Sequence, residues 1–238
     1  MASQSLRLIT WDATGTLLRV RGSVGEQYKA AGLLFDLACP EVTSLNAAFR
    51  EAYTEQSQHK PCYGSTCIRK TESGAWWATV VQETFKRCGV EDAPLIMKIA
   101  DYLYHDMKRP DRWEVFGDVH PALSWCKAQG LRLGVLSNFD DRLNGILSGV
   151  GLRSYFDVVL TSDEMGMQKP QPEAFHLALK HTNVQASNSR PYAAPCLAGR
   201  RPQSASFARS TDQRTLPGRP CSHDRRSTVF RPGGKFGS

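Results

Sequence analysis

Apolar positions repeat along this chain with two different periods, and together they predict an α/β fold. Short apolar runs bounded by turn residues occupy residues 6–11, 131–136 and 156–160, which is typical of buried strands. Helical spacing marks residues 121–129, 142–150 and 171–181. Because strands and helices alternate over this part, we expect a Rossmann-like parallel sheet.

A second pattern fills the interval from about residue 23 to residue 108, where the apolar spacing is helical throughout. Three stripes carry it: Leu45, Phe49 and Tyr53; Trp76, Trp77, Val80, Val81, Thr84 and Phe85; and Ile96, Ile99, Ala100, Leu103 and Met107. Prolines and glycines separate the predicted helices. The aromatic stripe is more typical of a packed core than of a cofactor site. The sequence therefore predicts a helical insertion between the first strand and the rest of the sheet.

Both periods stop after residue 183. The segment 185–238 carries nine Arg and one Lys against Asp212 and Asp224, whereas the rest of the chain is close to neutral. It is rich in Pro and Ser, and such a composition buries too little apolar area to offset chain entropy. We predict an α/β core over residues 1–18 and 113–184, a helical domain over 19–112, and a disordered basic tail over 185–238.

Composition narrows the setting in which the protein works. The apolar fraction of 41% supports a packed core, and no window has the ~18 consecutive apolar residues of a membrane helix. Seven scattered cysteines without a Cys-x-x-Cys pair indicate reduced thiols. The first residues lack a secretory pattern. We therefore expect an intracellular protein, most simply a cytoplasmic one, without a membrane partner.

Candidate chemistry begins at the end of the first predicted strand. Asp12 ends the apolar run, and the turn residues Thr14, Gly15 and Thr16 follow it. Open α/β sheets place ligands at the carboxyl ends of their strands. An aspartate held there can act as a nucleophile and form a covalent ester, and the turn can offer N–H groups and hydroxyls to an anionic substrate. The alternative is an aspartate that only caps a strand or helix.

Two further strand ends carry polar groups that suit the same chemistry. Ser137 and Asn138 follow the second predicted strand, and Lys169 follows the third, just before a helix. The Ser137 hydroxyl could hydrogen-bond a transferring group, and Lys169 could neutralise the charge of the aspartate and of a phosphate. We predict Asp12, Ser137 and Lys169 as catalytic residues, with Thr14, Gly15, Thr16 and Asn138 contacting substrate.

The ordered set of motifs resembles the haloacid dehalogenase superfamily. Residues 12–17 match its first motif except at Thr14, residues 135–138 match its second, and the Lys-Pro-x-Pro stretch at Lys169 matches its third. The resemblance covers roughly residues 5–182 and implies that the helical insertion is a cap that closes over the site and selects the substrate. It also implies an aspartate nucleophile and a Mg²⁺ cofactor.

Two departures from that family pattern affect the expected activity. The general acid of the family's phosphatases would stand at position 14, and Thr14 cannot replace it, a loss typically worth ~10²–10⁴-fold in rate. The fourth motif would supply further carboxylates for Mg²⁺, yet residues 188–196 contain no acid and two prolines that oppose a central strand. Asp12 alone would form a weak metal site. The first strand would then be an exposed edge.

These observations predict a protein that descends from hydrolases and is truncated before the fourth motif. We expect its tail to come from an alternative exon or a shifted reading frame. The protein would use Asp12 to hydrolyse a small phosphorylated or related metabolite, weakly or not at all. One alternative is a non-catalytic binding or regulatory protein of the same fold. Another is a nucleic-acid binder that acts through the basic tail alone.

Overall fold

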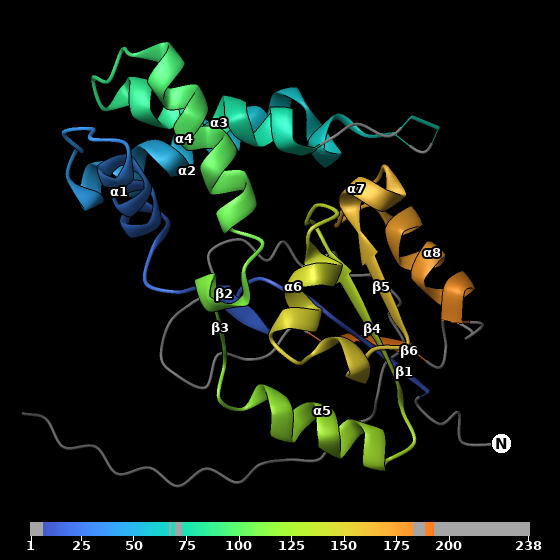
Figure 1. Ribbon diagram of the computed structural model, residues 1–238. Helices are drawn as coiled ribbons and strands as arrows, with labels where there is room; N and C mark the ends of the chain where they lie inside the picture. Colours follow the sequence, from blue (N-terminus) through green and yellow to red (C-terminus); the bar gives the residue numbers. More distant parts are fainter. Residues whose placement is uncertain (1–6, 67, 70–72, 183–188, 193–238) are drawn as a thin grey trace, which may run out of the picture. The chain divides into compact units, whose positions relative to one another are not determined.

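A four-stranded parallel sheet forms the centre of the fold (Figure 1). The computed structural model describes residues 7–66, 68–69, 73–182 and 189–192. The strand order is β5-β4-β1-β6, and the strands are β1 (Leu8–Trp11), β4 (Arg132–Ser137), β5 (Val158–Thr161) and β6 (Ser189–Tyr192). The predicted parallel α/β sheet is therefore confirmed, with small shifts at the strand ends.

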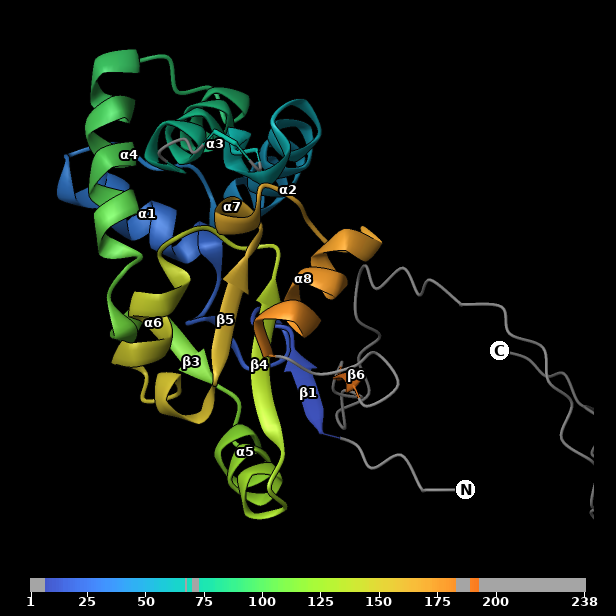
Figure 2. The ribbon, with the colours of Figure 1, turned by 90° about the vertical axis from the view of Figure 1, so that its right-hand side faces the viewer.

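Helices cover both faces of this sheet. Figure 2 shows α6 (Leu143–Gly149) and α8 (Pro172–Thr182) on opposite sides of β4 and β5. Side chains of β4 alternate between the faces: Leu133 packs in one cluster with α6 and with α5 (Val119–Ala128), whereas Leu136 packs against α8. The alternation explains why the apolar run of β4 is nearly continuous, since both of its faces are buried.

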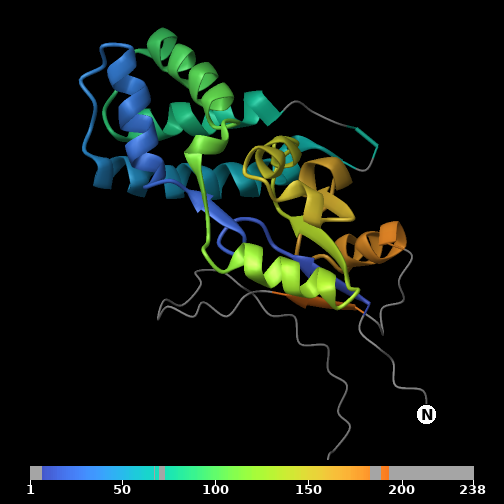
Figure 3. The same cartoon turned by 60° about the horizontal axis from the view of Figure 1, so that its bottom comes forward.

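In the sequence, a helical block, residues 24–106, is inserted between β1 and the other strands of the sheet. Figure 3 shows its helices grouped together at one end of the strands. The block contains α1 (Val24–Leu34), α2 (Val42–His59), the 3-10 turn η1 (Pro61–Gly64), α3 (Ser73–Arg87) and α4 (Ala93–Asp106). The helices share a core of their own, built around side chains such as Tyr28, Leu45, Phe85 and Ile99. Within the described residues, no helix is both long and apolar enough to cross a lipid bilayer.

Two short strands at the ends of the helical block were not predicted. β2 (Leu18–Val20) pairs antiparallel with β3 (Trp113–Val115), and Arg19 forms an ion pair with Glu114 at 3.0 Å. Three residues are too few to show a strand period. This small ribbon brings the entry and exit of the block together beside the sheet.

The expectation that no strand follows residue 183 was wrong. β6 pairs in parallel with β1, with Leu8 opposite Ser189 and Trp11 opposite Tyr192, so β1 is not an edge strand. The proline argument failed because β6 has a single neighbour among the described strands, and an edge strand tolerates a residue without an N–H, such as Pro191. The other residues of the predicted tail, 185–188 and 193–238, and with them the predicted nucleic-acid contact, lie outside the described residues.

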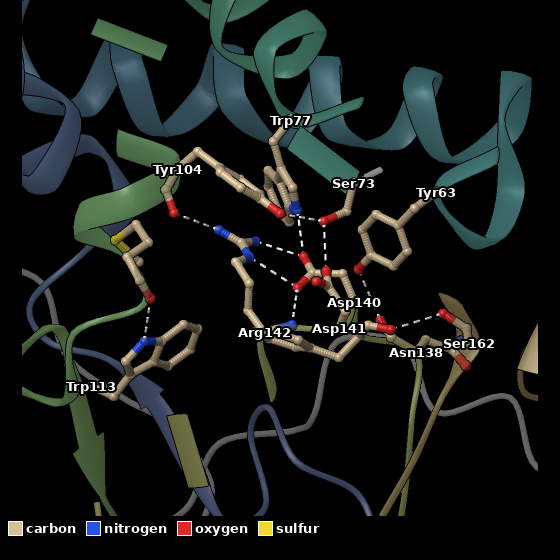
Figure 4. A network of polar contacts seen from close by, with 12 residues as sticks. Tyr63, Ser73, Trp77, Tyr104, Trp113, Asn138, Asp140, Asp141, Arg142 and Ser162 are labelled. Atoms are coloured by element: carbon tan, nitrogen blue, oxygen red, sulfur yellow. Dashed lines mark hydrogen bonds and ion pairs between the residues drawn. The ribbon is translucent and has the colours of Figure 1, made fainter. Parts of the chain in front are cut away.

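A buried ion pair ties the helical block to the loop that follows β4 (Figure 4). Asp140 has no exposed surface, and Arg142 contacts both of its carboxylate oxygens, through Nε at 2.9 Å and Nη2 at 2.6 Å. The indole of Trp77, on α3, donates to the same carboxylate. The Arg142 guanidinium lies 4.9 Å from the ring centre of Trp77 and 4.7 Å from that of Tyr104, which belongs to α4. We call this group the Asp140 network.

A further contact extends this connection between the block and the loop. Ser73, at the start of α3, donates to Asp141 at 2.8 Å and shares a hydrogen bond with the Tyr104 hydroxyl at the same distance. The loop after β4 thus contacts side chains from two helices of the block, α3 and α4. This loop lies at the carboxyl end of its strand.

We expect Arg142→Met to lower the free energy of unfolding by about 3–5 kcal/mol, because it leaves the Asp140 carboxylate buried without its cation. Urea unfolding followed by tryptophan fluorescence measures the change. Arg19→Met, which removes an exposed arginine from its ion pair, is the matched control and should leave the midpoint near that of the wild type. Equal effects of the two substitutions would contradict this role of the pair.

Candidate active site

Asp12 is the first residue after β1, and its carboxylate collects three donors on one oxygen. Oδ1 accepts from the Ala13 N–H at 2.8 Å and from the Ser137 hydroxyl at 3.1 Å, and it lies 2.8 Å from the Lys169 ammonium. The hydrogen bonds and the ion pair that the described residues make to Asp12 all engage Oδ1, and the side chain is 39% exposed. One oxygen is therefore fixed by three donors, whereas Oδ2 has no hydrogen-bond partner among the described residues.

The turn after Asp12 is tight and is closed by backbone hydrogen bonds. Leu17 N–H donates to Ala13 at 2.8 Å, and Gly15 N–H donates to Leu18 at 2.9 Å. Gly15 has φ of +82°, a conformation that glycine adopts without steric cost. Thr14 and Gly15 are exposed and Thr16 is half-buried, so solvent reaches the three predicted substrate contacts in the turn after Asp12.

The three predicted catalytic residues meet although they are far apart in the sequence. Ser137 ends β4, which is the direct neighbour of β1, so the parallel register sets its hydroxyl beside the carboxylate of Asp12. Lys169 comes from the loop between α7 (Ser162–Met165) and α8. It gives the aspartate a cationic partner and leaves a local charge close to zero.

Asn138 has a different set of contacts from the one expected. Its side chain accepts from the Lys169 N–H at 2.8 Å and donates to the Lys169 carbonyl at 3.0 Å. Both ends of the amide are thus used to hold the lysine backbone. The prediction that Asn138 contacts substrate was not tested, but the geometry assigns it first to Lys169.

The helical block reaches this site through η1, a contact that sequence reasoning missed. The Tyr63 hydroxyl donates to the Asn138 carbonyl at 3.3 Å, and the Cys62 thiol lies 3.9 Å from the Gln168 side chain. Ser65 hydrogen-bonds Asp163 at the start of α7. Burial raises the pKa of the Asp163 carboxyl, although the Ser65 hydrogen bond lowers it. In the sequence, the stretch Pro-Cys-Tyr-Gly resembles only a helix breaker.

The residues near Asp12 do not fit a Mg²⁺ site. Mg²⁺ prefers hard oxygen ligands in octahedral geometry, commonly from one or two carboxylates. Within the described part of the chain, no cluster of three or more His, Cys, Asp or Glu side chains could hold a metal. The Asp12 oxygen Oδ1 is occupied by Lys169 and Ser137, and Thr14 brings no carboxylate. A divalent ion could still meet Oδ2 of Asp12, but no cluster of acids among the described residues would supply the further ligands that it needs.

Chemically, the arrangement suits attack by an oxygen of Asp12 on an electrophilic centre. Lys169 and the Ser137 hydroxyl can stabilise negative charge that develops on the substrate. No general acid stands at position 14, so protonation of a leaving group has no evident source in the turn.

Comparison with known proteins agrees with this description of the fold. Residues 6–189 match the family model described as haloacid dehalogenase-like hydrolase. The chain is 45% identical over 180 residues to the haloacid dehalogenase-like hydrolase domain-containing protein 3 of Bos taurus, covering 76% of this chain and 70% of that protein. The protein of the same name from Danio rerio is 43% identical over 187 residues, covering 77% and 74%.

Among solved structures, the defluorinating L-2-haloacid dehalogenase Rha0230 superposes with a TM-score of 0.60 at 17% identity, over 78% of this chain and 72% of that one. At that identity the likeness shows the fold alone. The family match covers more than half of the chain, and the curated relatives share well over 30% identity. The chain belongs to the haloacid dehalogenase-like hydrolase family.

Proposed function

We propose that this protein hydrolyses a small phosphorylated or related metabolite through a covalent ester on Asp12. The observation that supports this most is the asymmetry of the carboxylate, with all three donors on Oδ1 of a side chain that is 39% exposed. A nucleophile that is oriented in this way has lost much of its rotational freedom before the substrate arrives. The helical block would serve as the cap over the site.

The missing general acid limits which bonds such a site can break. Asp12 would displace a leaving group that must depart without receiving a proton in the same step. That condition favours leaving groups that are stable as anions and disfavours simple alkyl phosphates. A weak hydrolase with a restricted set of substrates follows from it.

A second candidate function is a non-catalytic binding protein of the same fold. Thr14 at the acid position and the lack of a suitable metal cluster among the described residues favour it. In that case the paired Asp12 and Lys169 would only hold the anion of a ligand or stabilise the turn. Chemical trapping of an intermediate separates the two functions.

We expect Asp12 to form any covalent intermediate. Hydroxylamine converts an aspartyl ester or acyl phosphate to a hydroxamate, which mass spectrometry locates by residue. With p-nitrophenyl phosphate or a 2-haloacid as substrate, the wild type should carry the hydroxamate on Asp12, and Asp12→Asn should carry none. Asp118→Asn, a change of an exposed aspartate, is the control. Turnover that survives in Asp12→Asn would remove the nucleophile from this mechanism.

We expect little Mg²⁺-dependent phosphatase activity from this chain. Loss of the general acid alone costs about 3–5 kcal/mol of barrier, from a factor of ~10²–10⁴ in rate. Thr14→Asp should not restore the rate, because the described residues near Asp12 include no cluster of acids that would complete a metal site. The assay is release of inorganic phosphate from an alkyl phosphate such as glycerol 3-phosphate, whose leaving oxygen needs a proton, with Mg²⁺ and then with EDTA. Rapid turnover by the wild type that EDTA abolishes would refute this expectation.

A further inference from the structure

The turn η1 lies beside the site, and two of its residues have an unusual backbone conformation. Cys62 has φ of +52° and Tyr63 has φ of +60°, both in the left-handed region that non-glycine residues rarely adopt. Such conformations persist where many contacts with the surrounding structure hold them in place, and they cluster at functional sites. Here the turn directs two adjacent side chains to Asn138, in the loop after β4, and to Gln168, in the loop that carries Lys169.

Tyr63 is held rigidly on the helical block. Its ring is buried, lies 4.8 Å from that of Trp76 and packs in one cluster with Ala52 and Val80. Burial raises the pKa of the Tyr63 phenol, so the hydroxyl remains a protonated donor at neutral pH. It donates to the backbone carbonyl of Asn138 at 3.3 Å (Figure 4).

Asn138, which Tyr63 contacts, in turn holds the backbone of Lys169. Its side chain pairs with both the N–H and the carbonyl of Lys169, in the manner of a neighbouring strand. The lysine needs such support because the next residue, Pro170, has no N–H with which to anchor the loop. Of the described side chains, that of Asn138 is the one that hydrogen-bonds the Lys169 backbone. The lysine ammonium, at the end of a flexible four-carbon stem, then reaches Asp12 at 2.8 Å.

We propose that Tyr63 and Asn138 are positioning residues that set Lys169 against Asp12, so that docking of the helical block completes the charge pair at the nucleophile. Neither residue needs to touch the substrate in this role. The consequence for catalytic rate rests on the proposed function, whereas the placement of Lys169 can be measured without any turnover.

The test is the reactivity of the Lys169 amine toward an acylating reagent such as N-acetoxysuccinimide, measured by peptide mass spectrometry on the full chain. Lys127 is an internal reference, because it is similarly ion-paired, to Asp157 at 2.9 Å, and lies on α5. Asn138→Ala should raise the acylation rate of Lys169 relative to Lys127 by about fivefold, the factor that one net hydrogen bond typically contributes. Tyr63→Phe should give a smaller increase in the same direction.

Tyr28→Phe is the matched control, since it removes the hydroxyl of a buried tyrosine that packs in a different cluster of the same block from Tyr63. It should leave the acylation of Lys169 unchanged. Unchanged labelling in Asn138→Ala, or an equal rise in Tyr28→Phe, overturns the proposal. Asn138 is exposed and Tyr63→Phe keeps the ring, so both variants should fold, which circular dichroism verifies.

Activity gives a separate result. If the wild type turns over a substrate, Asn138→Ala should lower kcat and leave KM close to its original value, because the lysine acts on charge that develops in the transition state. A rise in KM with kcat unchanged overturns the positioning role. If the wild type shows no turnover and the labelling shifts as expected, the proposed function fails while the positioning role stands.

Discussion

The structure depends most on one carboxylate that is entirely removed from water. A buried Asp140 is tolerable only with a cation and further hydrogen bonds at close range, and Arg142 and Trp77 supply them. Trp77 comes from the helical block and Asp140 from the loop after β4. The cost of leaving this charge unpaired therefore opposes separation of the block from the sheet, and the same loop begins with Asn138, beside the site.

The surroundings of Asp12 differ from those of Asp140 in how far water reaches the carboxylate. Asp12 is partly exposed, so water screens its charge, and a single lysine with a hydroxyl is enough to orient it. The Asp12 carboxylate has its three described donors on one oxygen, whereas that of Asp140 has both oxygens engaged. Both aspartates follow strands of the sheet, and the difference in their burial fits a structural task for Asp140 and the chemical task proposed for Asp12.

The strands and long helices could be predicted because their apolar periods are local. The meeting of Asp12, Ser137 and Lys169 could be predicted from their places after strands of one sheet, while their catalytic roles stay predictions. The contacts of Tyr63, Trp77 and Asp140 could not be predicted, because each joins segments many residues apart and no local period records such a pairing. Asn138 was found by its place after β4, but its partner depends on the loop path at Lys169. The strands of three residues, β2 and β3, were too short to recognise.

The error at β6 shows that covering the flank of β1 and supplying ligands for Mg²⁺ place different requirements on a segment. A parallel ladder is built from backbone N–H and carbonyl groups, so nearly any segment can cover the flank of β1, and an edge position tolerates even Pro191. A metal site, in contrast, requires particular carboxylates at particular strand ends. Residues 189–192 contain no acid, and so they extend the sheet without bringing a ligand. Completion of the sheet and completion of a phosphatase site are thus separate requirements, and the described residues meet the first while showing no cluster of acids that could hold Mg²⁺ beside Asp12.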